Sequence, residues 1–126
     1  MRPVTVLAPI SLGELFDKIS ILELKTEFLR EQAQQHAREE LQALAAVLES
    51  LQLRIDPILL DQLKNINRSL WVLEEQIRSL EALQNFDDHF VQVARAIYSQ
   101  NDQRAVLKRT INTRYDSALI EEKSYR

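Results

Sequence analysis

The sequence is poor in the residues that build tight loops and reactive sites: among 126 residues it has no cysteine, one glycine and three prolines. The absence of cysteine excludes disulfides, thiolate metal ligands and a cysteine nucleophile. One glycine is too few for a glycine-rich phosphate-binding loop. The two histidines, His36 and His89, lie far apart without ligand spacing around them, so no zinc site is expected, nor any other metal or cofactor.

Positive charge is not in excess either, since 16 lysines and arginines face 19 aspartates and glutamates and the net charge is −3. Nucleic-acid-binding modules normally carry a basic excess on at least one face, so no nucleic-acid partner is predicted. No apolar run approaches the roughly 20 residues that span a bilayer. Residues 1–10 are too short and too interrupted by proline for a signal sequence. We therefore expect a cytoplasmic protein with no membrane partner.

What the chain does contain is typical of helices, because Leu, Ala, Glu, Gln, Lys and Arg are abundant and 45% of the residues are hydrophobic. The predicted fold class is all-α, with a single domain over residues 1–126. We expect a long antiparallel helical hairpin with heptad packing, followed by two shorter C-terminal helices. Residues 1–10 are expected to form an extended arm, and residues 117–126 a docked or flexible tail.

The first predicted helix runs from about residue 12 to about residue 53. Ser11, followed three residues later by Glu14, is typical of a capping box, which begins a helix. Apolar residues then recur in steps of three and four as far as Leu51. The glutamine-rich stretch 31–37 is the weakest part of this pattern, and whether the helix continues through it stays open.

The second predicted helix begins at Asp56-Pro57, because aspartate is a preferred cap and proline is tolerated at the first helical position. Its apolar stripe alternates strictly in steps of four and three, which predicts coiled-coil-like packing. The stripe consists of Leu59, Leu63, Ile66, Leu70, Leu73, Ile77 and Leu80. The short link between the two helices predicts that they are antiparallel neighbours. A third helix is expected to end near Ser99, and Asn101-Asp102 to cap a short fourth.

The start of the first helix is the strongest candidate for a functional site. Its apolar residues point in nearly every direction, which indicates burial all round, yet Glu14, Asp17 and Lys18 lie among them. A buried charge without a partner is costly. Either Glu14 pairs with Lys18 at i,i+4 and the remaining charges reach water, or these residues form one wall of a polar pocket.

The predicted fourth helix offers a basic face, because Arg104, Lys108 and Asn112 fall four residues apart. Such a face beside a helix N-terminus suits a phosphate or a carboxylate. Alternatively, Glu121 and Glu122 of the tail neutralise this face from within the fold.

The second helix offers a second wall of such a polar pocket in Lys64, Asn65, Asn67 and Arg68. Asn67 and Arg68 lie off the apolar stripe, so their default expectation is exposure to solvent. Trp71 is also off the stripe, and we expect it to pack against the third helix, with stacking on a ligand as the alternative.

The opening SLGELFDKISILELK, from Ser11 to Lys25, resembles that of a family of small bacterial proteins of unknown function. The similarity continues in NINRSLW (65–71), NDQRA (101–105) and EEKSY (121–125), and thus covers most of the chain apart from the middle of the first helix. The family carries no activity, cofactor or substrate that can be transferred. The resemblance implies that the polar segments chosen on physical grounds are distinctive of the family, which favours a pocket.

Two functions are predicted. The first is a helical protein-interaction or oligomerisation module, expected as a homodimer, because a first helix of about 60 Å would extend beyond a second of about 40 Å. The alternative is a protein or enzyme that binds a small anionic ligand such as a nucleotide or sugar phosphate. Its predicted ligand-binding residues are Glu14, Asp17, Lys18, Arg104 and Lys108, helped by the tail from Lys123 to Tyr125. Whether the protein is an enzyme stays open.

Overall fold

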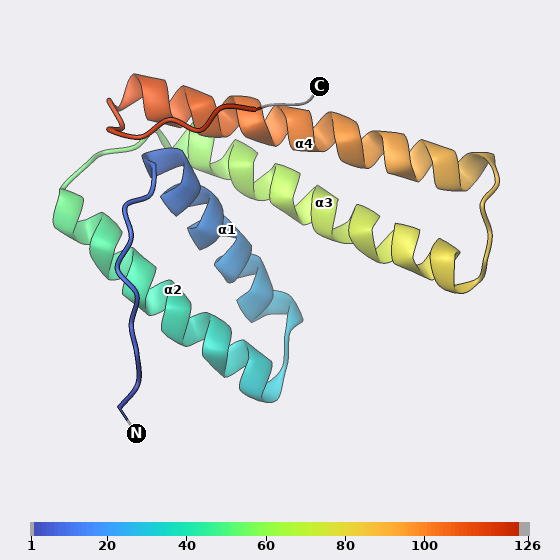
Figure 1. Cartoon of the computed structure of the whole chain (residues 1–126), viewed down its shortest axis with the longest axis horizontal. Coiled ribbons are helices and arrows are strands. Elements are labelled where there is room, and N and C mark those ends of the chain that lie inside the picture. Colours follow the sequence, from blue (N-terminus) through green and yellow to red (C-terminus); the bar gives the residue numbers. More distant parts are fainter. Residues whose placement is uncertain (1, 124–126) are drawn as a thin grey trace.

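The computed structural model of the chain describes residues 2–123 and contains four α-helices in this range (Figure 1). They are α1 (Leu12–Phe28), α2 (Glu31–Leu51), α3 (Pro57–Ala82) and α4 (Asp88–Arg114). No strand occurs among the described residues. The predicted all-α fold class is therefore confirmed, whereas the predicted course of the helices is wrong in several places.

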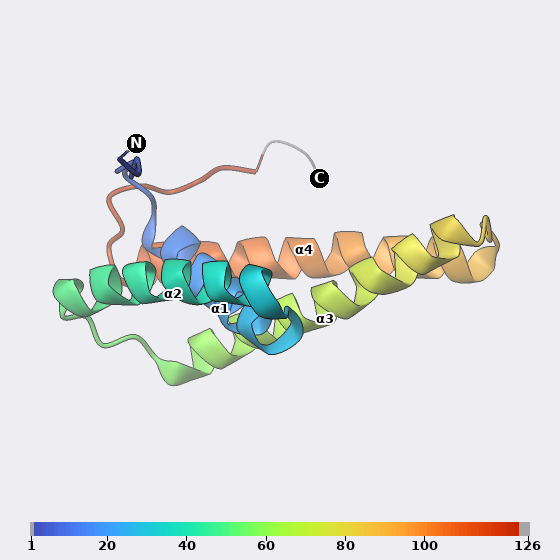
Figure 2. The ribbon, with the colours of Figure 1, turned by 90° about the horizontal axis from the view of Figure 1, so that it is seen from below.

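The longest part of the molecule is the antiparallel hairpin of α3 and α4 (Figures 1 and 2). α1 lies against one half of this hairpin, and α2 lies against α1. α3 begins as predicted, since the Asp56 side chain accepts a hydrogen bond from the Ile58 backbone N at 3.0 Å and Pro57 is the first helical residue. Asp87 caps α4 in the same way, accepting from the His89 backbone N at 3.1 Å. Each cap satisfies a backbone N–H group that the first helical turn leaves free.

Two apolar clusters hold the helices together. The first joins α1, α3 and α4 and consists of Phe16, Leu59, Leu63 and Ile111. The second joins α3 to α4 further along the hairpin and consists of Leu70, Val93 and Ile97. Burying one such side chain contributes about 1.5–3 kcal/mol. The first cluster therefore fixes the start of α1 against the C-terminal half of α4, and this contact positions the polar residues described below.

The predicted long first helix over residues 12–53 is wrong, because the chain turns at Leu29 and Arg30 and α2 folds back beside α1 (Figure 1). Both turn residues have extended backbone, with ψ values of 162° and 159°. The Gln34 side chain donates a hydrogen bond to the Thr26 carbonyl at 2.8 Å. This contact satisfies one of the carbonyl groups that the end of α1 leaves free. The glutamine-rich stretch itself is helical.

The predicted third and fourth helices are also wrong as separate elements, because α4 runs through Asn101 and Asp102 without interruption. Instead of capping a helix, the Asn101 side chain makes a contact within α4 and the Asp102 side chain a contact with the tail. Asn101 Oδ1 accepts from Arg104 Nη1 at 3.5 Å, and Asp102 pairs with Lys123. The predicted hairpin paired the helix before Asp56 with the helix after it. In the structure these helices, α2 and α3, are not in contact: α3 lies against α4 and α1, and among the four helices α2 contacts α1 alone.

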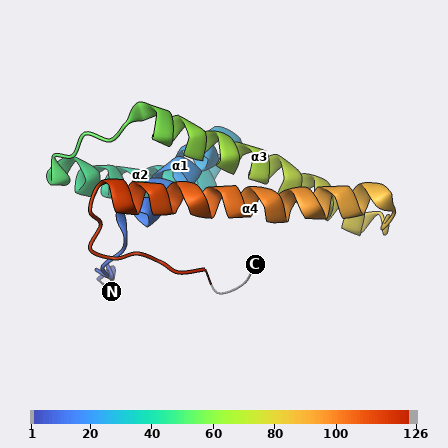
Figure 3. The same cartoon turned by 90° about the horizontal axis from the view of Figure 1, so that it is seen from above.

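The segments before α1 and after α4 lie on the same face of the molecule (Figures 2 and 3). Residues 2–10, called the arm below, form neither helix nor strand and are all exposed. After α4 the chain reverses, and residues 115–123, called the tail below, run back along α4 (Figure 1). Residues 124–126 of the predicted tail lie outside the described residues.

Candidate functional site

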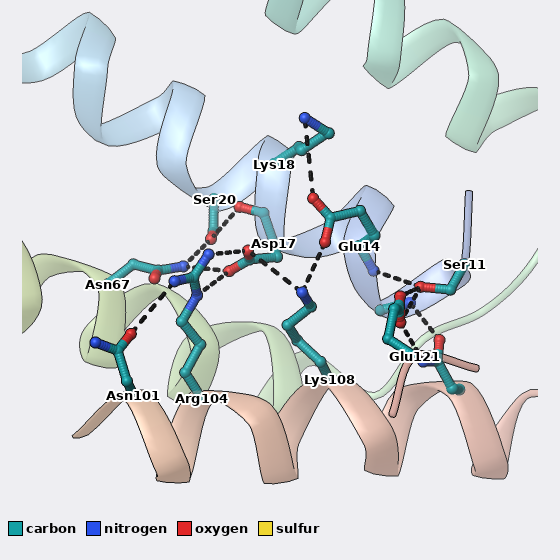
Figure 4. Close-up of polar contacts among 12 residues, drawn as sticks. Ser11, Glu14, Asp17, Lys18, Ser20, Asn67, Asn101, Arg104, Lys108 and Glu121 are labelled. Atoms are coloured by element: carbon teal, nitrogen blue, oxygen red, sulfur yellow. Dashed lines mark hydrogen bonds and ion pairs between the residues drawn. The ribbon is translucent and has the colours of Figure 1, made fainter. Parts of the chain in front are cut away.

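The five residues predicted as a site lie together between α1 and α4 (Figure 4). Lys108 Nζ is 2.6 Å from a carboxylate oxygen of Glu14 and 4.0 Å from one of Asp17. Arg104 pairs with both carboxylate oxygens of Asp17, and Lys18 Nζ is 3.9 Å from Glu14. Residues three or four apart share one face of a helix, so each helix presents its polar residues to the other. That they bind a ligand stays a prediction.

Asp17 is the centre of this cluster and is only 1% exposed. Its Oδ1 accepts hydrogen bonds from Arg104 Nε and from Asn67 Nδ2, both at 2.9 Å. Asn67 Nδ2 also donates to Ser20 Oγ at 2.7 Å, and Ser20 Oγ donates to the Asp17 backbone carbonyl at 2.9 Å. The hydrogen bond to Asp17 raises the pKa of Arg104 above its ordinary value, against the opposing effect of burial. Without these partners, a buried carboxylate would cost several kcal/mol.

Backbone contacts join the first turn of α1 to α4. Ser11 caps α1 as predicted, its Oγ accepting from the Glu14 backbone N at 3.0 Å, while the Glu14 side chain turns to Lys108. The Gly13 backbone N donates to Asn112 Oδ1 at 2.6 Å. A Cβ atom on Gly13 would lie 2.5 Å from the Lys108 carbonyl oxygen. The close approach of the two helices therefore requires glycine at this position.

The tail adds a further carboxylate to the site. Glu121 accepts hydrogen bonds from Ser11 Oγ at 2.9 Å and from Asn112 Nδ2 at 3.3 Å. Partial burial alone would raise the pKa of Glu121, but these hydrogen bonds outweigh it and hold the pKa below its ordinary value. Glu122 lies 2.9 Å from Arg109 on α4. The two cations of the predicted basic face, Arg104 and Lys108, pair with Asp17 and Glu14 of α1. The charges of this face are therefore balanced mainly from α1 and not, as considered from the sequence, by the tail alone.

The cluster is saturated by its own contacts. Each of its charged groups has an ion-pair or hydrogen-bonding partner among the described residues. A general acid or base must reach a proton of a bound substrate, and the burial of Asp17 denies it that access. The cluster therefore holds α1 on α4, and a ligand would have to bind at its margins.

Two clefts border the cluster, and Asn101 and Arg104 line both of them. The central cleft, of about 440 Å³, is formed by α1, α3 and α4 and is further lined by Ile21, Leu24, Asn67, Leu70, Trp71, Glu74, Glu75 and Arg78. The tail cleft, of about 810 Å³, lies between α4 and the tail, and its charged residues are Asp102, Arg104, Lys108, Arg109, Glu121, Glu122 and Lys123.

Sequence reasoning missed the role of Asn67. The predicted solvent exposure is wrong, because Asn67 is only 5% exposed and bonds to Asp17. Its spacing contained a signal: Asn67 follows Leu63 by four residues and precedes Leu70 by three, and both leucines are buried. Trp71 follows Leu70, and its ring contact is with Phe28 of α1, with centroids 5.1 Å apart and planes tilted by 40°; the predicted partner was the third helix.

The described residues contain no group of three or more His, Cys, Asp or Glu side chains placed to hold a metal ion. No helix among them has both the length and the apolar character needed to cross a membrane.

A comparison with protein families decides what the chain is related to. A family model described as a family of unknown function, DUF6165, matches residues 6–126. The chain belongs to this family. No curated protein and no solved structure matches it. In this DUF6165 protein the matched range includes the polar-cluster residues of both α1 and α4, the tail, and all four helices of the described range. The family relationship assigns no activity, so the functional argument rests on the geometry.

Proposed function

We propose that this DUF6165 protein is a helical interaction module that associates with a second copy of itself. The observation that carries this proposal is the surface that the chain leaves exposed, 9343 Å². A compact monomer of 14.7 kDa exposes about 6,900 Å² by the general scaling of surface with mass. The surplus of roughly 2,400 Å² exceeds the about 800 Å² that each partner contributes to a standard interface.

Apolar side chains make up part of this surplus. Large exposed ones occur on every helix and on the tail, and some of them are grouped in the arm, on α2 and at the tip of the α3–α4 hairpin. They include Val4, Val6, Leu7, Val47, Leu51, Leu83 and Phe86. In α2, Ala37 alone is buried, although an amphipathic helix normally covers a whole apolar stripe. Scattered exposed apolar residues need no explanation, but grouped ones favour an interaction surface.

The experiment is sedimentation velocity of the full chain across the micromolar concentration range. We expect the mass to rise from that of one chain to that of two as the concentration increases. A single-chain mass at every concentration would refute self-association. A cytoplasmic location belongs to the same proposal, and cell fractionation tests it.

A second candidate function is binding of a small anionic ligand such as a nucleotide or sugar phosphate. It is favoured by the four cationic side chains that line the tail cleft, Arg104, Lys108, Arg109 and Lys123. Asp17 and Glu14 support this wall from α1, since they pair with Arg104 and Lys108, and Lys18 pairs with Glu14 in turn. The volume of about 810 Å³ lies in the range of small-molecule pockets. An incoming phosphate would exchange with the carboxylates of the tail.

A thermal-shift screen with nucleotides, sugar phosphates and Mg²⁺, each added separately, tests this candidate. A ligand that binds only the folded state raises the melting temperature. The rise should be lost in Lys108→Gln and retained in Lys25→Gln, a matched change on α1 outside both clefts. If no ligand class shifts the melting temperature of the unmodified chain, the candidate is wrong.

A further inference from the structure

The arm has apolar side chains and nothing to bury them against. Val4, Val6 and Leu7 are 88%, 82% and 92% exposed. Within the part of the chain that the structure describes, no arm residue takes part in a hydrogen bond or ion pair. Leaving such side chains in water forgoes about 1.5–3 kcal/mol each. The arm therefore lacks a surface in its own monomer.

The central cleft offers the groups that an extended segment needs. Ile21, Leu70 and Trp71 give it apolar walls. Asn67 Oδ1 and Asn101 Nδ2 have no hydrogen-bond partner among the described residues, and both point away from the Asp17 carboxylate (Figure 4). An amide acceptor and an amide donor in the lining of one cleft can bond to the N–H and C=O groups of an extended backbone.

Charge favours the same match. Arg2 is the only charged residue of the arm. The charged residues that line the central cleft are Glu74, Glu75, Arg78 and Arg104, and Arg104 is already paired with Asp17. Arg78 is 3.5 Å from Glu74, which leaves Glu75 without an ion-pair partner among the described residues. If the arm lies in this cleft, Arg2 can form an ion pair with Glu75.

We propose that the arm of one copy lies in the central cleft of a second copy, and that the exchange is reciprocal. This inference rests on the proposed self-association and names its surface. The apolar arm residues lie on Trp71 and Ile21, the arm backbone bonds to the two asparagines, and Arg2 meets Glu75. Nine extended residues reach about 30 Å, enough to cross between molecules. A two-fold exchange fills both clefts and closes the assembly as a dimer.

Charge reversal tests the pairing of Arg2 with Glu75. Because each dimer contains the contact twice, Arg2→Glu or Glu75→Arg alone should weaken dimerisation about tenfold. The double variant Arg2→Glu/Glu75→Arg should restore it. The matched control is Arg2→Glu/Glu81→Arg, since Glu81 lies on the same helix and does not line the cleft. Failure of the first combination to restore the dimer, or equal rescue by the control, would refute the assignment.

Trp71 is the only tryptophan and lines the cleft, so its fluorescence reports directly on occupation of this site. We expect its emission to shift to shorter wavelength as dimers form, because the arm excludes water from the ring. Val6→Asp should abolish this shift and weaken dimerisation at least about a hundredfold. Val106 is an exposed valine on α4 outside both clefts. As the control, Val106→Asp should leave both the emission shift and dimerisation unchanged.

The outcomes separate this inference from the proposed function. If the chain dimerises but Trp71 emission is constant, the arm does not occupy the cleft, whereas self-association stands. If the emission of a monomer is already shifted and Val6→Asp reverses it, the arm docks within its own chain and the exchange is wrong. If no dimer forms at any concentration, both proposals fail.

Discussion

Removing either partner of the Arg104–Asp17 pair should give unequal losses of stability. Arg104→Ala strands a carboxylate that is 1% exposed, with only the Asn67 amide at 2.9 Å and Lys108 at 4.0 Å left to it. Breaking a buried pair in this way costs about 3–5 kcal/mol. Asp17→Asn leaves a guanidinium whose side chain is 29% exposed and keeps an amide oxygen as acceptor, so it should cost about 1–3 kcal/mol.

Urea unfolding followed by the helical circular dichroism signal measures both losses. A difference of about 2 kcal/mol separates the two midpoints by about 1 M urea, because the slope is about 1–3 kcal/mol per molar. Arg109→Ala is the matched control on the same helix, since its pair with Glu122 is exposed and should contribute at most about 1 kcal/mol. The double variant Arg104→Ala/Asp17→Asn should lose less than the sum of the single losses. Equal losses from Arg104→Ala and Asp17→Asn would refute the description of Asp17 as the buried member.

Three further variants test other parts of the site. Gly13→Ala should lower the free energy of unfolding by about 1–3 kcal/mol in urea titrations, because the added Cβ meets the Lys108 carbonyl. Helix propensity alone would act the other way and stabilise the protein by about 1 kcal/mol. A higher free energy of unfolding for Gly13→Ala would contradict the close approach of α1 and α4. Asn67→Asp should lower the melting temperature clearly more than Asn65→Asp, an exposed neighbour, because it places a second carboxylate beside Asp17. Glu121→Gln should be less stable than the unmodified chain at neutral pH. Because folding lowers the pKa of Glu121, this difference in stability is fully present above the unfolded pKa of about 4.3. It fades as the pH falls through the pKa of the folded state. A difference in stability that grew in acid would contradict a lowered pKa of Glu121.

The helix ends with a local signal could be predicted from the sequence, and those set by tertiary contacts could not. Ser11 and Asp56 are used as caps, since each needs only a side chain and a nearby backbone N–H. The turn at Leu29 and Arg30 has no glycine or proline to mark it. When two antiparallel helices each bury an apolar stripe, the stripe of the second can follow that of the first in steps of three and four. Periodicity alone therefore does not separate one long helix from two.

The charged residues of the candidate site could be predicted from the sequence. Glu14, Asp17 and Lys18 stood out because charges on an all-round apolar helix need partners, and the partners are the predicted Arg104 and Lys108. Asn67 and Asn112 were considered on their own helices but not as partners of these charges, and Ser20 was not singled out, because asparagine and serine are common on solvated helix faces. Only the packing of α1 between α3 and α4 makes them interior residues.

The attachment of α2 to α1 alone has a consequence for how the molecule comes apart. Regions with few buried apolar contacts open at lower free energy than the rest of a structure, and in α2 Ala37 is the only fully covered residue. The junction of α1, α3 and α4 keeps its clusters and its ion pairs when α2 detaches. We therefore expect the amide hydrogens of α2 to exchange with solvent before those of the junction. A single melting temperature would then average over two cooperative units of different stability.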